Sequence, residues 1–170
     1  VNAGLLVMNL PVWRADGVAE RCLALLSDPA RPLMSEDQSA LNIAAAGRIL
    51  PLPARYNVYA DPAAYPGAAA VPADPAVIHY VVGHKPWAAR GVMMGEVWRH
   101  HAGLIAAQMP PLPAASLGSR LSAFNRQRKL WMGLAAGRGK YRTQRQVRAA
   151  MRRVAARYLA QVAGRPVSGR

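Results

Sequence analysis

The chain contains a single cysteine, so no intramolecular disulfide holds its fold together. Cys22 lies in a leucine-rich, helical-looking stretch, which favours a reduced, cytosolic compartment. The chain also lacks an uncharged apolar run of about 20 residues, the length needed to cross a bilayer. The nearest candidate, residues 100–119, is interrupted by three prolines. With 52% hydrophobic residues, the composition indicates a folded protein rather than a disordered one.

Acidic residues are absent from the last part of the chain. Residues 111–170 hold 14 Lys and Arg and no Asp or Glu, whereas residues 1–110 hold eight of each sign. The whole net charge of +14 therefore belongs to residues 111–170. We expect a neutral domain at 1–110, followed by a basic tail that suits a polyanionic partner.

Hydrophobic patterning in the first 110 residues predicts an α/β domain. Residues 4–10 form a continuous apolar run of the kind found in buried strands. Further along, the pattern predicts helices at 16–27, 35–47 and 96–107, extended pieces at 49–53 and 56–59, a loop at 61–75, a strand at 76–82, and a stiff proline-rich linker at 110–113.

The basic tail is predicted to form two helices, at 117–136 and 141–162, separated by a glycine-containing turn. In the second helix, apolar residues recur at helical spacing and make one stripe with arginines on its flanks. The members of the stripe are Val147, Met151, Val154, Tyr158 and Val162. This is the pattern of a basic amphipathic helix.

Residues 79–87 bring together more side chains suited to phosphate or metal binding than any other short stretch of the sequence. His79 and Lys85 flank Gly83, directly after an apolar strand-like stretch. A glycine permits close backbone approach to a phosphate, and an ammonium supplies a point charge for it. These residue types favour binding of a metal-bound diphosphate. A histidine within an apolar strand is also common as a core residue, and that alternative stays open.

Two further polar clusters interrupt apolar segments. Asp37 and Gln38 open a helix, where Ser35 and Gln38 have the spacing of a capping box that would account for them structurally. Asn2-Ala3-Gly4 precedes the apolar run at 4–10 as a turn, or as a ligand-binding strand end. Asn57 is equally ambiguous, with a turn residue as the default interpretation.

Taken in order, these clusters resemble the C-terminal half of glycosyltransferase family 8, the retaining, nucleotide-sugar-dependent group that includes bacterial lipopolysaccharide transferases and glycogenin. The matching stretches lie at 2–10 with 13–14, 37–42, 52–57 and 78–87, and together they span residues 2–87, about half of the chain. The resemblance implies the C-terminal part of a GT-A (Rossmann-like) domain at 1–110, a UDP-sugar donor and a divalent metal, usually Mn²⁺.

Roles of individual residues follow from the resemblance alone. It implies that Asp37 and Gln38 are catalytic, with Gln38 near the anomeric carbon. His79 is the implied metal ligand. The implied donor-sugar contacts are Asn2, Ala3, Gly4, Asp37 and Gln38, and the implied diphosphate contacts are His79, Gly83 and Lys85. The glycine stands one position later than in the family pattern, where Val82 occupies the usual place.

The family's Asp-x-Asp motif, which would complete the metal site, lies upstream of the segment that begins at Asn2. The chain opens at Val1 without an initiator methionine or a signal-like segment. We therefore expect a piece of a longer protein that begins in mid-strand and is inactive without its N-terminal half.

The expected activity is metal-dependent transfer of a hexose from a UDP-sugar to a glycan or lipid-linked acceptor, as in bacterial lipopolysaccharide assembly. Residues 117–162 are expected to bind an anionic membrane surface, which would place the protein at the cytoplasmic face of the membrane. Nucleic acid is the rival polyanion, but no nucleic-acid-binding signature accompanies the charge, so no specific nucleic acid is expected. The alternative function is a basic membrane- or polyanion-binding module without catalysis.

Overall fold

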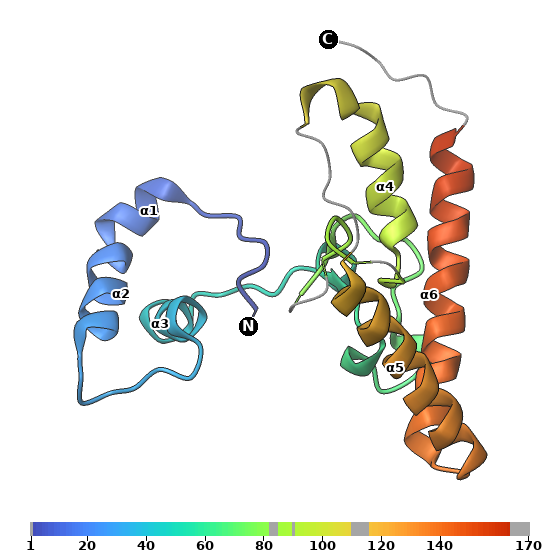
Figure 1. Cartoon of the computed structure of the whole chain (residues 1–170). Coiled ribbons are helices and arrows are strands. Elements are labelled where there is room, and N and C mark those ends of the chain that lie inside the picture. The colour runs from blue at the N-terminus through green and yellow to red at the C-terminus, as the bar shows by residue number, and fades with distance from the viewer. Residues whose placement is uncertain (1, 82–84, 90, 110–115, 164–170) are drawn as a thin grey trace. The chain divides into compact units, whose positions relative to one another are not determined.

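The computed structural model describes residues 2–81, 85–89, 91–109 and 116–163, with the Ser119 side chain left out. Packing divides the chain into two units, Val1–Tyr56 (unit 1) and Asn57–Arg170 (unit 2), and each is considered by itself (Figure 1).

Unit 1 is helical. Its elements are α1 (Leu10–Ala15), α2 (Val18–Ser27), α3 (Glu36–Ala44) and the 3₁₀ turn η1 (Ala54–Tyr56), and α2 packs along α3. The Asn9 side chain caps α1 by accepting from the backbone N–H of Val12, at 3.3 Å. Gly17, in the left-handed region at φ 57°, reverses the chain between α1 and α2.

The predicted buried strand at residues 4–10 is wrong. Residues 4–9 are irregular, Leu10 opens α1, and Leu6, Val7 and Met8 are exposed. The described part of unit 1 contains no strand. An apolar run forms a stable strand only when a neighbouring strand satisfies its backbone groups. With no such neighbour in unit 1, the Asn9 cap directs the chain into a helix instead.

Unit 2 contains a small parallel sheet. Its strands are β1 (Val58–Tyr59) and β2 (Ile78–His79), with Val58 opposite Ile78 and Tyr59 opposite His79. The connection between them carries the 3₁₀ turns η2 (Pro62–Ala64) and η3 (Ala68–Ala70) rather than a helix. Of the strand predicted at 76–82, the described residues 76–81 are extended as a strand only at Ile78–His79, and Val82 lies outside the described residues. The described chain is mainly helical with one short parallel pair.

The helices of unit 2 follow the sheet. They are α4 (Gly95–Leu104), the 3₁₀ turn η4 (Ala106–Gln108), α5 (Leu117–Ala135) and α6 (Gly139–Ala163), close to the helices predicted at 96–107, 117–136 and 141–162. No helix in the described part of the chain is long and apolar enough to span a bilayer.

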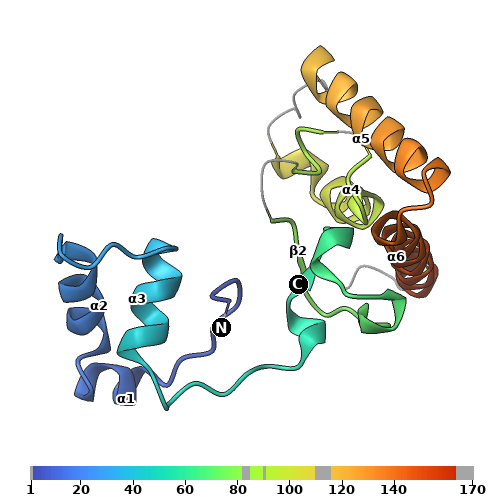
Figure 2. The same ribbon diagram turned by 90° about the horizontal axis from the view of Figure 1, so that it is seen from below.

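The core of unit 2 is built around α6, which contacts α4, α5, η2 and η3 (Figures 1 and 2). Its buried members are Val58, Val71, Met93, Met94 and Val97, together with Val147, Ala150, Met151, Val154 and Ala155 from α6. Four members of the apolar stripe predicted on this helix therefore lie in the core or pack against it, namely Val147, Met151, Val154 and Tyr158, while Val162 is partly exposed. The boundary predicted at residue 110, between a catalytic domain and a tail, stays a prediction.

Candidate functional site

The first candidate cluster lies within unit 1, where Gln38 ties α3 to the N-terminal segment. The Gln38 Oε1 atom accepts from Asn2 Nδ2 at 3.0 Å and from the Ala3 backbone N–H at 3.3 Å. Gly4 closes the turn by donating its N–H to Asn2 Oδ1 at 2.8 Å. The structure therefore brings Gln38 to the turn formed by Asn2, Ala3 and Gly4, more than 30 positions away in the sequence.

The capping-box alternative for Gln38 is not what the structure shows. Ser35 is the N-cap of α3, but its side chain caps no backbone N–H. Instead, Ser35 Oγ accepts from Gln38 Nε2 at 3.1 Å. The amide of Gln38 is thus held from both ends, by Ser35 and by Asn2, which fixes its orientation.

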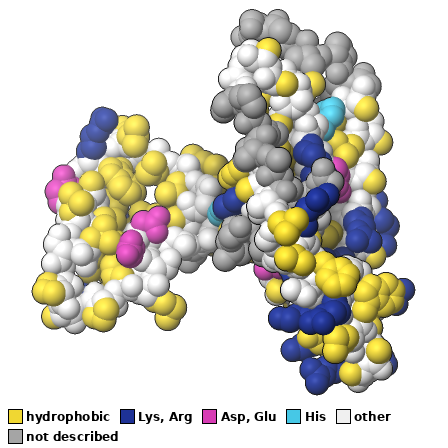
Figure 3. All heavy atoms as spheres, viewed as in Figure 1, with side chains coloured by type: hydrophobic (Ala, Val, Ile, Leu, Met, Phe, Trp, Pro, Cys, Tyr) yellow, Lys and Arg dark blue, Asp and Glu magenta, His cyan; other side chains and the backbone are white. Residues whose placement is uncertain are grey.

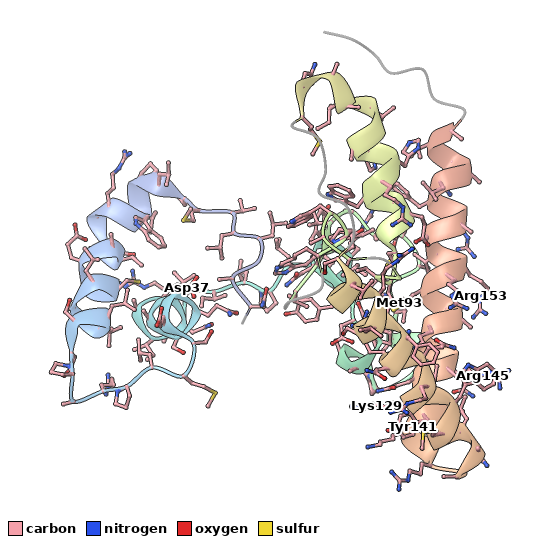
Figure 4. All side chains as sticks on the ribbon, viewed as in Figure 1. Asp37, Met93, Lys129, Tyr141, Arg145 and Arg153 are labelled. Carbon is pink, nitrogen blue, oxygen red and sulfur yellow. The ribbon has the colours of Figure 1, made fainter. Side chains whose placement is uncertain are left out.

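Asp37 presents an exposed carboxylate on the first turn of α3 (Figure 4). Its Oδ1 accepts the backbone N–H of Gln38 at 2.8 Å. The positive end of a helix dipole stabilises a negative charge at this position. Asp37 is therefore an acceptor open to solvent, next to the held amide of Gln38.

The second cluster lies within unit 2, at the end of the parallel strand pair. His79 Nδ1 lies 3.0 Å from Asn57 Oδ1, and the His79 ring is tilted against that of Tyr59 with their centroids 5.8 Å apart. An amide oxygen accepts and cannot donate, so Nδ1 is the donor in this contact. The neutral tautomer that fits this contact has its lone pair on Nε2. Metal-binding histidines in proteins are commonly oriented in this way through the other ring nitrogen.

The sequence leaves the role of Asn57 ambiguous, with a turn residue as the default. In the structure its side chain hydrogen-bonds His79 from 22 positions away. The sequence signals are its place before the apolar pair Val58–Tyr59 and within the matching stretch 52–57. The parallel register that sets Tyr59 beside His79 made the contact possible, and two-residue strands leave no readable periodicity.

Lys85 and two tryptophans follow the strand. Lys85 Nζ donates to the Tyr80 backbone oxygen and lies 6.0 Å from the centre of the Trp87 ring, which in turn contacts Trp98 at 5.8 Å. An ammonium has three donors, so one internal hydrogen bond leaves donors for an anion.

Tyr80 fixes the backbone at the start of α4. Its hydroxyl donates to the Met94 oxygen at 2.7 Å, and burial raises the pKa of Tyr80 to about 12. Met94 is buried and adopts the left-handed region at φ 57°, which is uncommon for a residue with a side chain. The hydrogen bond and the burial together hold this conformation.

Gly83, expected to contact the diphosphate, lies outside the described residues. In the described ranges, no three His, Cys, Asp or Glu side chains gather where they could hold a metal. His79 fits the geometry of one metal ligand, and the described residues supply no complete ligand set around it.

Comparison with family models gave a match to glycosyl transferase family 8 over residues 1–91. Comparison with curated proteins found no match, and comparison with solved structures found none either. The matched range contains both clusters and more than half of the 170 residues. The resemblance drawn from the sequence is thereby confirmed at the level of the family, and the chain belongs to glycosyltransferase family 8.

Proposed function

We propose that this glycosyltransferase moves a hexose, with retention of configuration, from a UDP-sugar to a glycan or lipid-linked acceptor, and that residues 1–110 belong to a GT-A domain. The observation that carries the proposal is the orientation of His79 by Asn57, with Nε2 left free of that contact.

In this proposal the cluster of unit 1 contacts the donor sugar. Asp37 accepts hydroxyl hydrogen bonds, while Asn2, Ala3 and Gly4 form the turn that Gln38 holds. The two lone pairs of an amide oxygen are both engaged at Gln38 Oε1 by these contacts. We therefore assign Gln38 the role of orienting the sugar pocket, in preference to that of a nucleophile.

In unit 2, His79, Gly83 and Lys85 would receive the diphosphate. Glycosyl transfer proceeds through an oxocarbenium-like state as the leaving group takes up negative charge. Lys85 offsets that charge with an ammonium held above Trp87. A divalent metal such as Mn²⁺, when bound, supplies further charge neutralisation. Its ligands would be His79 Nε2 and the carboxylates of the family's Asp-x-Asp motif, which lies upstream of Asn2.

The test is donor and metal binding in the protein that carries residues 1–170. His79→Ala should abolish Mn²⁺-dependent binding of UDP, measured by calorimetry, and should abolish transfer. Asn57→Ala should weaken Mn²⁺ affinity by about 10- to 100-fold, as for other groups that orient a metal ligand. Asn57→Asp should restore most of it because it keeps an acceptor oxygen.

The matched control is His101→Ala, which removes an exposed imidazole from α4 and should leave binding unchanged. UDP and Mn²⁺ binding that survives in the His79→Ala variant would overturn the assignment. An Asn57→Ala variant that binds metal normally would limit Asn57 to a structural role.

We also propose that residues 117–162 contact an anionic membrane surface at the cytoplasmic face, consistent with a lipid-linked acceptor in bacterial lipopolysaccharide assembly. The support is the charge of residues 111–170, which is entirely positive. Membership of a glycosyltransferase family favours this membrane-associated enzyme over a binding module without catalysis.

A further inference from the structure

Helix α5 has a packing face that turns toward α6. Leu130 and Gly133 are buried on this face, and Ser122, Ala123, Arg126 and Leu134 are partly buried. An alanine Cβ at Gly133 would lie only 2.1 Å from the Tyr141 ring, which shows how closely the two helices approach. These residues account for the fold of the α5–α6 hairpin.

A second apolar face of α5 is exposed. Its members are Leu117, Leu121, Phe124, Trp131 and Met132, which are between 56% and 73% exposed. At about 100° per residue, these five positions fall within an arc of about 100°, centred opposite the packing face. The residues that pack α5 onto α6 are therefore different from those in the outward stripe, and folding of the hairpin leaves the stripe uncovered.

Cations accompany the outward stripe. Arg128 falls within its arc, and Arg120 and Lys129 lie on its two flanks. Lys and Arg side chains gather over α5 and α6 among hydrophobic ones (Figure 3). Long basic side chains can keep their charge at a polar boundary while their stems cover apolar surface. Such a face, apolar in the middle and basic at its edges, is typical of a helix that lies in a membrane interface.

The apolar stripe of α6 cannot contact a membrane while unit 2 is folded. Val147, Met151 and Val154 are buried in the core, and Tyr158 packs against it. What α6 offers outward is charge, as Arg145 and Arg153 on its exposed side show (Figure 4).

From the two faces of α5 we infer that its outward stripe inserts into the surface of an anionic lipid bilayer, with the helix axis parallel to the membrane plane and α6 adding cations. This inference rests on the proposed membrane partner and assigns the contact to one helix face. A second copy of the chain is a poorer occupant, because a symmetric pair would bring two all-positive surfaces together. Nucleic acid would use the cations but not the apolar stripe.

The experiment is co-sedimentation of the full chain with phosphatidylcholine vesicles, with and without phosphatidylglycerol. Wild type should bind only the anionic vesicles. The triple variant Leu121→Gln/Phe124→Gln/Trp131→Gln should bind at least about tenfold more weakly, because three side chains lose their apolar burial. Circular dichroism should show it folded, since the stripe makes no part of the core.

The matched control is Leu104→Gln/Ile105→Gln, which removes two apolar side chains that are 51% and 48% exposed at the end of α4. It should bind as wild type does. In brominated-lipid vesicles, tryptophan quenching should fall in Trp131→Phe and persist in Trp98→Phe.

The outcomes separate the two ideas. If wild type binds no vesicle, both the membrane partner and the stripe are overturned. If wild type binds and the triple variant binds equally, the stripe is overturned while the membrane partner stands. Loss of self-association in the triple variant, without any vesicle binding by wild type, would identify a second copy as the occupant instead.

Discussion

Units 1 and 2 are both mainly helical, yet they protect their apolar side chains very differently. In the described part of unit 1 the buried hydrophobic residues are Val18, Ala40 and Ala44, while Met34 and Leu50 are almost fully exposed. Unit 2 has a contiguous core of ten buried residues, five of them from α6. In unit 1, α2 packs along α3 with few fully buried side chains, and polar contacts such as that between Arg48 and Asp16 add to this packing.

The difference teaches where each candidate cluster obtains its rigidity. His79 and Lys85 belong to unit 2, which has a packed core. The positions of these two residues therefore depend on apolar side chains that are buried elsewhere in the unit. Asn2 and Gln38 depend on hydrogen bonds that the cluster itself makes. A hydrogen bond contributes about 1 kcal/mol net, whereas burial of one large apolar side chain contributes about 1.5–3 kcal/mol. Substitutions of buried apolar residues should therefore give the largest difference in the loss of stability between the two units.

The largest expected effect is in the core of unit 2. Met151→Ala removes a fully buried side chain of α6 and should lower the free energy of unfolding of unit 2 by about 2–5 kcal/mol. Met34→Ala in unit 1 makes the same chemical change at an exposed position and should cost about 0.5 kcal/mol or less. Urea unfolding followed by circular dichroism measures both. Equal losses would remove the contrast between the units.

A second substitution tests the close approach of α5 and α6. Gly133→Ala places a Cβ inside the Tyr141 ring position, so the helices must separate, at a cost of about 1–3 kcal/mol. Gly118→Ala is the control in the same helix, because the nearest atom to its Cβ is 3.9 Å away, and it should be neutral or slightly stabilising. Adding Tyr141→Ala to Gly133→Ala should recover part of the loss; full additivity would argue against the clash.

The third prediction concerns pH. Burial raises the pKa of Tyr80 from 10.0 to about 12, so the fold favours the neutral phenol. That contribution to stability is fully present below pH 10 and is lost as the pH rises toward 12. Tyr80→Phe should cost about 1 kcal/mol at pH 8, through the lost bond to Met94, and should flatten the decline between pH 10 and 12. Unfolding midpoints at the two ends of this range measure the difference, and parallel curves would contradict it.

The smallest expected effect is a gain in stability rather than a loss. Arg148 is half-buried and its Nε atom has no hydrogen-bond partner. Burial, with Arg152 and Arg126 nearby, lowers the pKa of Arg148. Arg148→Met removes the unsatisfied Nε–H group and loses only the long hydrogen bond from Nη1 to the Met93 sulfur, at 3.8 Å, so it should stabilise unit 2 by up to about 1 kcal/mol. Arg153→Met, at an exposed position of the same helix, should change stability little. A destabilised Arg148→Met variant would show that the guanidinium contributes to the packing.

Much of the helical structure of this chain could be predicted because it rests on local patterns. The helices at 117–136 and 141–162 are long and strongly periodic, and the structure reproduces them within three residues at each end. The strand predicted at 4–10 failed because an apolar run has no period of its own, and a strand exists only where another strand pairs with it. Asn2 and Gln38 could be selected as candidates because both belong to polar clusters that interrupt apolar segments.

The sequence by itself determined the family, the segregation of charge, the helices of residues 117–163 and the residue types of both clusters. Only the tertiary structure decided that Asn57 orients His79 and that Gln38 is held by Asn2 and Ser35. It also decided that most of the α6 stripe is buried in the core, whereas the α5 stripe is exposed. The reason is physical. Helical periodicity shows that a face is apolar, but what covers that face depends on neighbours distant in the sequence.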